Sequence, residues 1–119
     1  MSIPNTLAIH RLLNALEQQT ADDLESQFLD FKPWQGPKED LRVACEYAAC
    51  FANANGGVVI FGVSDKKRGR AQAIHGVKGY DIDVFRRGIY DGTSPGIDAE
   101  VSEIVVPEGT GKLLVVRVG

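Results

Sequence analysis

The stretch from residue 38 to residue 63 constrains the fold of this chain more than any other. Residues 38–54 place Leu41, Ala44 and Ala48 on one face of a helix, and the small residues on that face indicate close packing. Asn55-Gly56-Gly57 then ends the helix, and the apolar run 58–63 follows. Such a run is typical of a strand buried on both faces. The chain is therefore expected to form a sheet with helices packed against it.

The remaining periodicities complete the expected fold. A helix is predicted over residues 7–18, and its apolar face consists of Leu7, Leu12, Leu13 and Leu16. Further helices are predicted over 20–24 and 81–90, strands over 27–32, 99–106 and 112–118, and a short extended piece over 73–77. Together they predict an α+β fold, with a mixed, mainly antiparallel sheet packed with helices. The predicted division is an N-terminal helical segment at 1–21 and the main domain at 22–119.

Composition excludes several classes of protein. The chain has 119 residues, 44% of them hydrophobic and 24% charged, which is enough for one packed core and unlike a disordered chain. Its two cysteines, Cys45 and Cys50, point in different directions on the predicted helix and resemble small apolar fillers in a reducing compartment. The sequence contains no Cys/His cluster and no membrane-spanning apolar stretch. We expect a cytoplasmic protein without structural zinc.

Three segments of the sequence together resemble one known family. They are ESQFLDFK (residues 25–32), CFANANGG (residues 50–57) and VIFGVSD (residues 59–65), and IHG at 74–76 fits the pattern that follows. Over residues 22–118 the chain resembles the AlbA-like domain of Schlafen proteins and of bacterial transcriptional regulators. The resemblance implies a DNA- or RNA-binding domain. It also implies that a C-terminal domain of a longer protein is missing here, because such regulators usually continue beyond this point.

The same resemblance implies a set of acidic residues. Some Schlafen proteins are endoribonucleases with three carboxylates, and the matching positions here are Glu25, Asp30 and Asp65, which would bind Mg²⁺ or Mn²⁺. Asp30 stands where the family normally has Glu, which shortens that ligand by one methylene. Strand spacing alone places Asp30 and Lys32 on one face of the strand. There Lys32 would stabilise the negative charge that develops during phosphodiester cleavage. The alternative is a solvated surface ion pair worth less than about 1 kcal/mol.

The turn between the predicted helix and strand has two interpretations. Asn53, Gly56 and Gly57 would let backbone N–H groups approach a phosphate. The turn follows the C-terminus of a helix, however, and the helix dipole repels anions there. A glycine cap with a tight turn is therefore favoured, with Asn53 hydrogen-bonded to a neighbouring loop.

Charge is distributed unevenly along the chain. The net charge is −3, yet seven basic and only three acidic residues fall between residues 63 and 87. We expect six of these basic side chains to contact nucleic-acid phosphates. They are Lys66, Lys67, Arg68 and Arg70 on one loop, and Arg86 and Arg87 on a helix. The loop has no aromatic residue, so base stacking would come from Tyr80 or Trp34. The alternative is a loop kept polar for solubility.

These features predict a nucleic-acid-binding domain that needs no cofactor for binding. Two alternatives remain open. One is the metal-dependent endoribonuclease, and the other is an assembly module that forms a homodimer through an exposed strand, with residues 112–118 as the candidate. His10 and His75 have no partner at catalytic or metal-ligand spacing and are expected to be structural or exposed.

Overall fold

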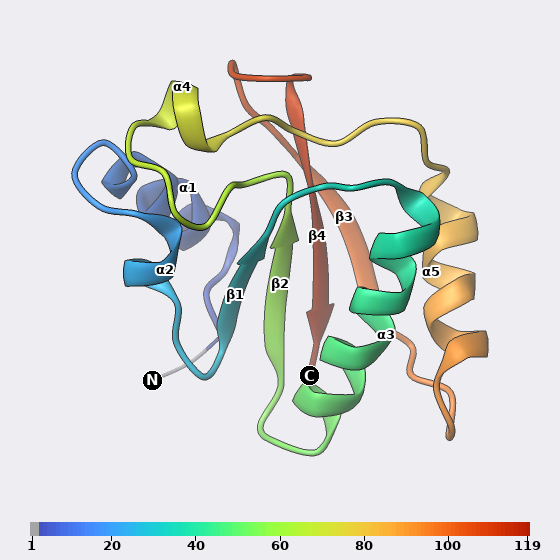
Figure 1. Cartoon of the computed structure of the whole chain (residues 1–119). Helices are drawn as coiled ribbons and strands as arrows, with labels where there is room; N and C mark the ends of the chain where they lie inside the picture. The colour runs from blue at the N-terminus through green and yellow to red at the C-terminus, as the bar shows by residue number, and fades with distance from the viewer. Residues whose placement is uncertain (1–2) are drawn as a thin grey trace.

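The computed structural model describes residues 3–119. It consists of a four-stranded sheet with helices on both faces (Figure 1). The helices are α1 (Thr6–Ala15), α2 (Ala21–Leu24), α3 (Pro37–Ala52), α4 (Arg70–Ala73) and α5 (Ile82–Gly92). The strands are β1 (Leu29–Lys32), β2 (Gly57–Phe61), β3 (Glu100–Val105) and β4 (Lys112–Val118). None of these helices has the length and apolarity needed to cross a membrane.

The strands lie in the order β1-β2-β4-β3. β1 and β2 run parallel, because α3 crosses over between them, whereas the other two pairs are antiparallel. The predicted mixed, mainly antiparallel sheet is thus confirmed. The prediction that residues 112–118 form an exposed strand is wrong, since β4 is paired on both sides. Its apolar residues 113–116 are all buried, as expected for a central strand, and β1 and β3 form the edges.

Two hydrophobic clusters fill the space between the sheet and the helices. On one face, Phe31 and Ile60 belong to the same cluster as Leu13 of α1. On the other face, Val59 and Phe61 belong to a cluster with residues of α3 and α5. β2 contributes to both clusters and all of its residues are buried, which confirms the predicted strand buried on both faces.

The structure corrects two details of the predicted elements. In α1 the buried face is Ile9, Leu13 and Leu16, whereas Leu7 is 60% exposed because the helix turns it away from the sheet. Residues 70–73 form one helical turn, α4, which is too short to produce a readable apolar periodicity. The extended piece begins only after it, at Ile74, which pairs with Val63.

Side-chain caps determine where the helices begin. Thr20 and Asp23 form a capping box at the start of α2, with each side chain accepting the other's backbone N–H. At α3, Asp40 is buried, and its carboxylate accepts the backbone N–H groups of Gln35 (2.6 Å) and Gly36 (2.9 Å). This carboxylate therefore satisfies donors that the chain exposes as it enters the helix.

The turn between α3 and β2 requires glycine. Gly56 has a φ of +87°, and its N–H donates to the Phe51 carbonyl at 3.0 Å, which closes the helix end. A Cβ at Gly56 would lie 2.6 Å from the Val118 carbonyl oxygen, and one at Gly57 would overlap the Phe51 ring. This is the geometry of a glycine helix cap followed by a tight turn.

We expect Gly56→Ala to destabilise the domain more than Gly79→Ala does. Both glycines have a positive φ, +87° and +75°, so each substitution adds backbone strain of roughly 1–2 kcal/mol. Only Gly56 is crowded, because apart from Gly79 itself and its two chain neighbours, no atom within residues 3–119 lies within 4 Å of a Cβ at Gly79. Urea unfolding of the two variants measures the difference. Equal losses of stability would show that the contact with Val118 is not what requires glycine.

Candidate functional site

The loops that follow β1 and β2 lie at one end of the sheet, together with the hairpin between β3 and β4 (Figure 1). In α/β sheets this carboxyl end of the parallel strands is where ligands commonly bind. Residues 74–81, which we call the strap, cross this end from α4 to α5. Backbone bonds hold the strap in place: His75 N–H donates to Gly62 (3.0 Å), and Val77 N–H donates to Lys112 (3.1 Å).

The loop between β2 and α4 presents Lys66, Lys67 and Arg68, which we call the loop cations, and all three are exposed. The loop is attached to α2, because Asp22 N–H donates to the Asp65 carbonyl at 2.9 Å. The side chain of Lys66 is 82% exposed and its Nζ lies 3.9 Å from Asp22 Oδ2, a solvated pair that contributes little to stability. The loop cations are therefore accessible to a phosphate.

Arg70 differs from the loop cations beside it. Its guanidinium donates to Glu108 at 2.7 and 3.1 Å and to Asn14 Oδ1 at 2.6 Å. The side chains of Arg70 and Glu108 are only 18% and 17% exposed, and the arginine holds the pKa of Glu108 below its usual value. Arg70 thus ties α4 to α1 and to the β3–β4 hairpin. The structure therefore separates Arg70 from the loop cations, with which it was predicted from the sequence to contact phosphates.

Arg86 and Arg87 lie away from the loop cations, on α5 at the other side of the molecule (Figure 1). Arg86 forms an ion pair with Asp83 at 3.0 Å, and Arg87 forms one with Asp91 at 3.6 Å. The structure does not bring these arginines and the loop cations together into one surface.

Glu25 and Asp30 come together at the outer edge of β1. Glu25 Oε2 accepts a hydrogen bond from Phe31 N–H at 2.9 Å, which covers a donor on the free edge of the strand. Burial raises the pKa of Glu25 to about 8, and the neighbouring Asp30 carboxyl adds to the effect. Glu25 is therefore mostly protonated at neutral pH. Asp30 Oδ1 is buried without a hydrogen-bond partner in the described part of the chain.

Lys32 lies on the same face of β1 as Asp30, as the strand spacing predicts. Its ammonium is 5.3 Å from the centre of the Tyr47 ring on α3. Burial alone would lower the pKa of Lys32, but Tyr47 and Asp30 outweigh it and hold that pKa above its usual value. Burial, and then Asp30, raises the pKa of Tyr47, so the phenol stays protonated. The sequence analysis missed Tyr47, although its position one helical turn before the buried Phe51 was an available signal.

A divalent ion would need a third ligand beside Glu25 and Asp30. Within residues 3–119, no three His, Cys, Asp or Glu side chains form a group that could hold a metal ion. Asp65, the third position implied by the resemblance, is attached to α2 through its backbone carbonyl and does not join the pair in such a group. A protonated Glu25 is also a poor ligand. The residues present therefore do not complete a three-carboxylate metal site.

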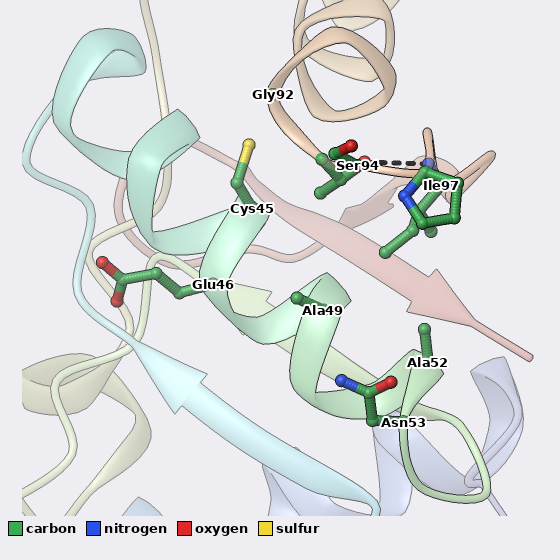
Figure 2. A pocket seen from close by; sticks show the side chains of 10 residues that line it. Cys45, Glu46, Ala49, Ala52, Asn53, Gly92, Ser94 and Ile97 are labelled. Carbon is green, nitrogen blue, oxygen red and sulfur yellow. Dashed lines mark hydrogen bonds between the residues drawn. The ribbon is translucent and has the colours of Figure 1, made fainter.

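A pocket of about 490 Å³ lies between α3 and the segment after α5 (Figure 2). Asn53 lines it, but within residues 3–119 its side chain does not form the hydrogen bond to a neighbouring loop that is predicted from the sequence. Thr93 also lines the pocket, and its Oγ1 accepts the Ile97 N–H at 2.8 Å. Burial raises the pKa of the Cys45 thiol, which therefore stays protonated. The pocket thus has no activated cysteine nucleophile.

Tyr80 of the strap and Trp34, which follows β1, form an aromatic group. The rings of Trp34 and Tyr80 meet edge to face, with their centres 5.5 Å apart. Trp34 is held at two points: its Nε1–H donates to the Lys78 carbonyl (2.9 Å), and its backbone N–H donates to His75 Nε2 (3.0 Å). Lys112 Nζ lies 5.5 Å from the centre of the Tyr80 ring. His75 thus has a structural partner, in agreement with its expected role.

We expect Glu25 to make the domain less stable as the pH rises from about 5 to about 8. Its pKa is 4.5 in an unfolded chain and about 8 in the folded one, so the folded state binds this proton more tightly. The resulting contribution to stability is complete below the unfolded value and is lost as the pH passes the folded value. The variant Glu25→Gln has no proton to lose, and its amide oxygen still accepts the Phe31 N–H.

Urea unfolding at pH 5 and pH 8 tests this expectation. Wild type should lose more free energy of unfolding between the two conditions than Glu25→Gln does. Glu100→Gln, at an exposed position on β3, is the matched control and should behave like wild type. The same pH dependence in wild type and Glu25→Gln would contradict the raised pKa.

Comparison with known proteins agrees with this fold. Residues 25–119 match the family model described as Schlafen, AlbA_2. Among solved structures, the fold is similar to that of the DIP2311 protein from Corynebacterium diphtheriae, with a TM-score of 0.66 and 24% sequence identity. The similarity covers 93% of this chain and 24% of that one, so this chain spans about a quarter of the length of that structural relative. No curated protein matches the chain by sequence. The family suggests a nucleic-acid-binding domain, and the match over most of its length shows that the chain belongs to the Schlafen AlbA_2 family.

Proposed function

We propose that this domain binds nucleic acid through its phosphate backbone, and that the loop cations Lys66, Lys67 and Arg68 make the principal contacts. The observation that carries the proposal is the exposure of three consecutive cations on a loop attached to the carboxyl end of β2. Membership in the Schlafen AlbA_2 family supports the class of ligand. Contacts of this kind position a nucleic acid without reading its sequence.

The other basic residues contribute less to the proposed surface. Arg70 is engaged by Glu108 and Asn14, so a phosphate would have to replace contacts that the fold already uses. Arg86 and Arg87 are paired with carboxylates on their own helix. The acidic residues of α2 lie beside the loop cations, which favours a moderate affinity that depends strongly on salt.

Neutralising two loop cations should flatten the salt dependence of binding. Each phosphate contact contributes a slope of about 0.7 to 0.9 in a plot of log K against log salt, because binding releases condensed counterions. The double variant Lys67→Gln with Arg68→Gln should therefore lower the slope by about 1.4 to 1.8. Fluorescence anisotropy of a labelled oligonucleotide at several salt concentrations measures it.

The matched control is the double variant Arg86→Gln with Arg87→Gln. It removes the same charge from α5 and should leave the slope close to that of wild type. Equal changes in the two double variants would mean that only the overall charge matters. An unchanged slope in the loop variant would exclude the loop as the contact surface.

A metal-dependent endoribonuclease that uses Mg²⁺ or Mn²⁺ is the second candidate, although within residues 3–119 Glu25 and Asp30 have no third carboxylate beside them to complete a metal site. The observation in its favour is the pairing of Glu25 and Asp30, with Asp30 Oδ1 buried and unpartnered in the described part of the chain. Incubation of the domain with structured RNA and either ion tests it. Cleavage that stops in Asp30→Asn but persists in Asp98→Asn, an exposed control, would establish the activity. RNA that stays intact at high protein concentration would leave binding as the function.

A further inference from the structure

Tyr80 of the strap and Trp34 form an aromatic group that is separate from the loop cations. Tyr80 lies at the end of the strap where it enters α5, and Trp34 follows β1, so both rings are at the end of the sheet that carries the loop cations (Figure 1). Both side chains are half-buried, and Trp34 also meets Phe61 and Phe85 beneath it. The group is therefore anchored in the core and reaches the surface.

Hydrogen bonds hold the two rings in fixed orientations. Trp34 is bound at its backbone N–H by His75 and at its indole N–H by the Lys78 carbonyl. The Tyr80 hydroxyl donates to Glu103, and burial together with this carboxylate raises the pKa of Tyr80, so the donor stays protonated. A ring that is already immobilised loses little conformational entropy when a ligand stacks on it.

Tyr80 is only partly buried, and a lysine lies over its ring. The group above it is the ammonium of Lys112, 5.5 Å from the ring centre, and the Lys112 side chain is 44% exposed. Within residues 3–119, the carboxylate that pairs with Lys112 is Glu103, at 3.4 Å, and the Glu103 side chain is 37% exposed. Because the lysine stem is flexible, a planar ligand can displace the ammonium from the ring face at little cost. The displaced ammonium would then lie beside the ligand.

Cations flank the ring on the strap and on β4. Lys78 is exposed two residues before Tyr80, and Val77 N–H donates to the Lys112 carbonyl, which keeps the backbones at these two lysines close. Proteins that bind single-stranded nucleic acid combine an aromatic ring with nearby cations. A base stacks on the ring, and the phosphates beside that base contact the lysines. Bases in a duplex are stacked and paired, so such a ring is available only to an unpaired base.

We propose that Tyr80, supported by Trp34 and flanked by Lys78 and Lys112, is a stacking platform for an unpaired base of single-stranded nucleic acid. The proposal rests on the proposed function and adds the form of the ligand and a second contact site. A strand held by the loop cations would follow the strap to Tyr80. The eight residues of the strap, 74–81, span at most about 29 Å when fully extended, which a few nucleotides can bridge.

Trp34 provides a direct readout because it is the only tryptophan of the chain. The probes are an oligothymidylate of about 12 nucleotides, within the usual range of single-strand site sizes, an abasic chain of the same length, and a duplex. The oligothymidylate should quench Trp34 fluorescence and bind more tightly than the abasic chain. The duplex should bind through the loop cations without quenching Trp34.

Substitutions at position 80 separate stacking from structural support. Tyr80→Leu should weaken binding of the oligothymidylate roughly 5- to 100-fold, whereas Tyr80→Phe keeps the ring and should retain binding. Tyr90→Leu is the control, because Tyr90 is 51% exposed on α5 and should leave binding unchanged. Circular dichroism checks that each variant folds. If Tyr80→Leu does not fold, the affinity of wild type for the oligothymidylate, compared with its affinity for the abasic chain, still tests the platform.

Failure of the platform and failure of the proposed function give different results. Equal affinity for the oligothymidylate and the abasic chain, without quenching of Trp34, overturns the platform and leaves the phosphate contacts standing. Equal weakening by Tyr80→Phe and Tyr80→Leu also overturns it, since the ring itself would then not matter. Absence of binding to every probe overturns both proposals.

Discussion

Burial of β2 on both faces is the constraint on which the rest of the structure depends. Because β2 has no polar face, the sheet needs a cover on each side, and α1 supplies one while α3 and α5 supply the other. β4 pairs with β2, and its residues 113–116 are buried beneath the same helices. Both strands are therefore central, and polar groups are confined to the edges and ends of the sheet. The loop cations and Tyr80 lie at one end of the sheet, and the Glu25–Asp30 pair lies at an edge.

The cations near the end of β2 show how tertiary contacts divide residues that are adjacent in sequence. Lys66, Lys67 and Arg68 remain exposed, whereas Arg70 meets Glu108 and Asn14 from segments distant in the chain. The difference arises because Arg70 begins α4, which packs between α1 and the β3–β4 hairpin. A bidentate arginine–carboxylate pair with low exposure is a structural contact. The spacing of residues in the sequence does not predict this contact.

The carboxyl pair at β1 illustrates a second effect of the fold. Glu25 lies outside the strand, yet its carboxyl covers the Phe31 N–H on the free edge. This position buries Glu25 next to Asp30, which raises its pKa and keeps a proton on the pair. The other free edge, β3, has no such cover from an adjoining segment among the bonds that the structure describes. The same carboxyl group thus protects an edge and sets the charge of a candidate site.

The sequence by itself determined the α+β class, the order of the main helices and strands, the helix caps and the family. These features depend on local periodicity, on capping residues such as Thr20 and on motifs that are continuous in the chain. Only the tertiary structure decided that β4 is central, that Arg70 is engaged and that Tyr47 and Tyr80 join polar clusters. The physical reason is that pairing and burial are made between distant segments, whose partners no local pattern specifies. The acidic net charge, which argues against nucleic acid when taken alone, therefore says less than the exposure of three consecutive cations on one loop.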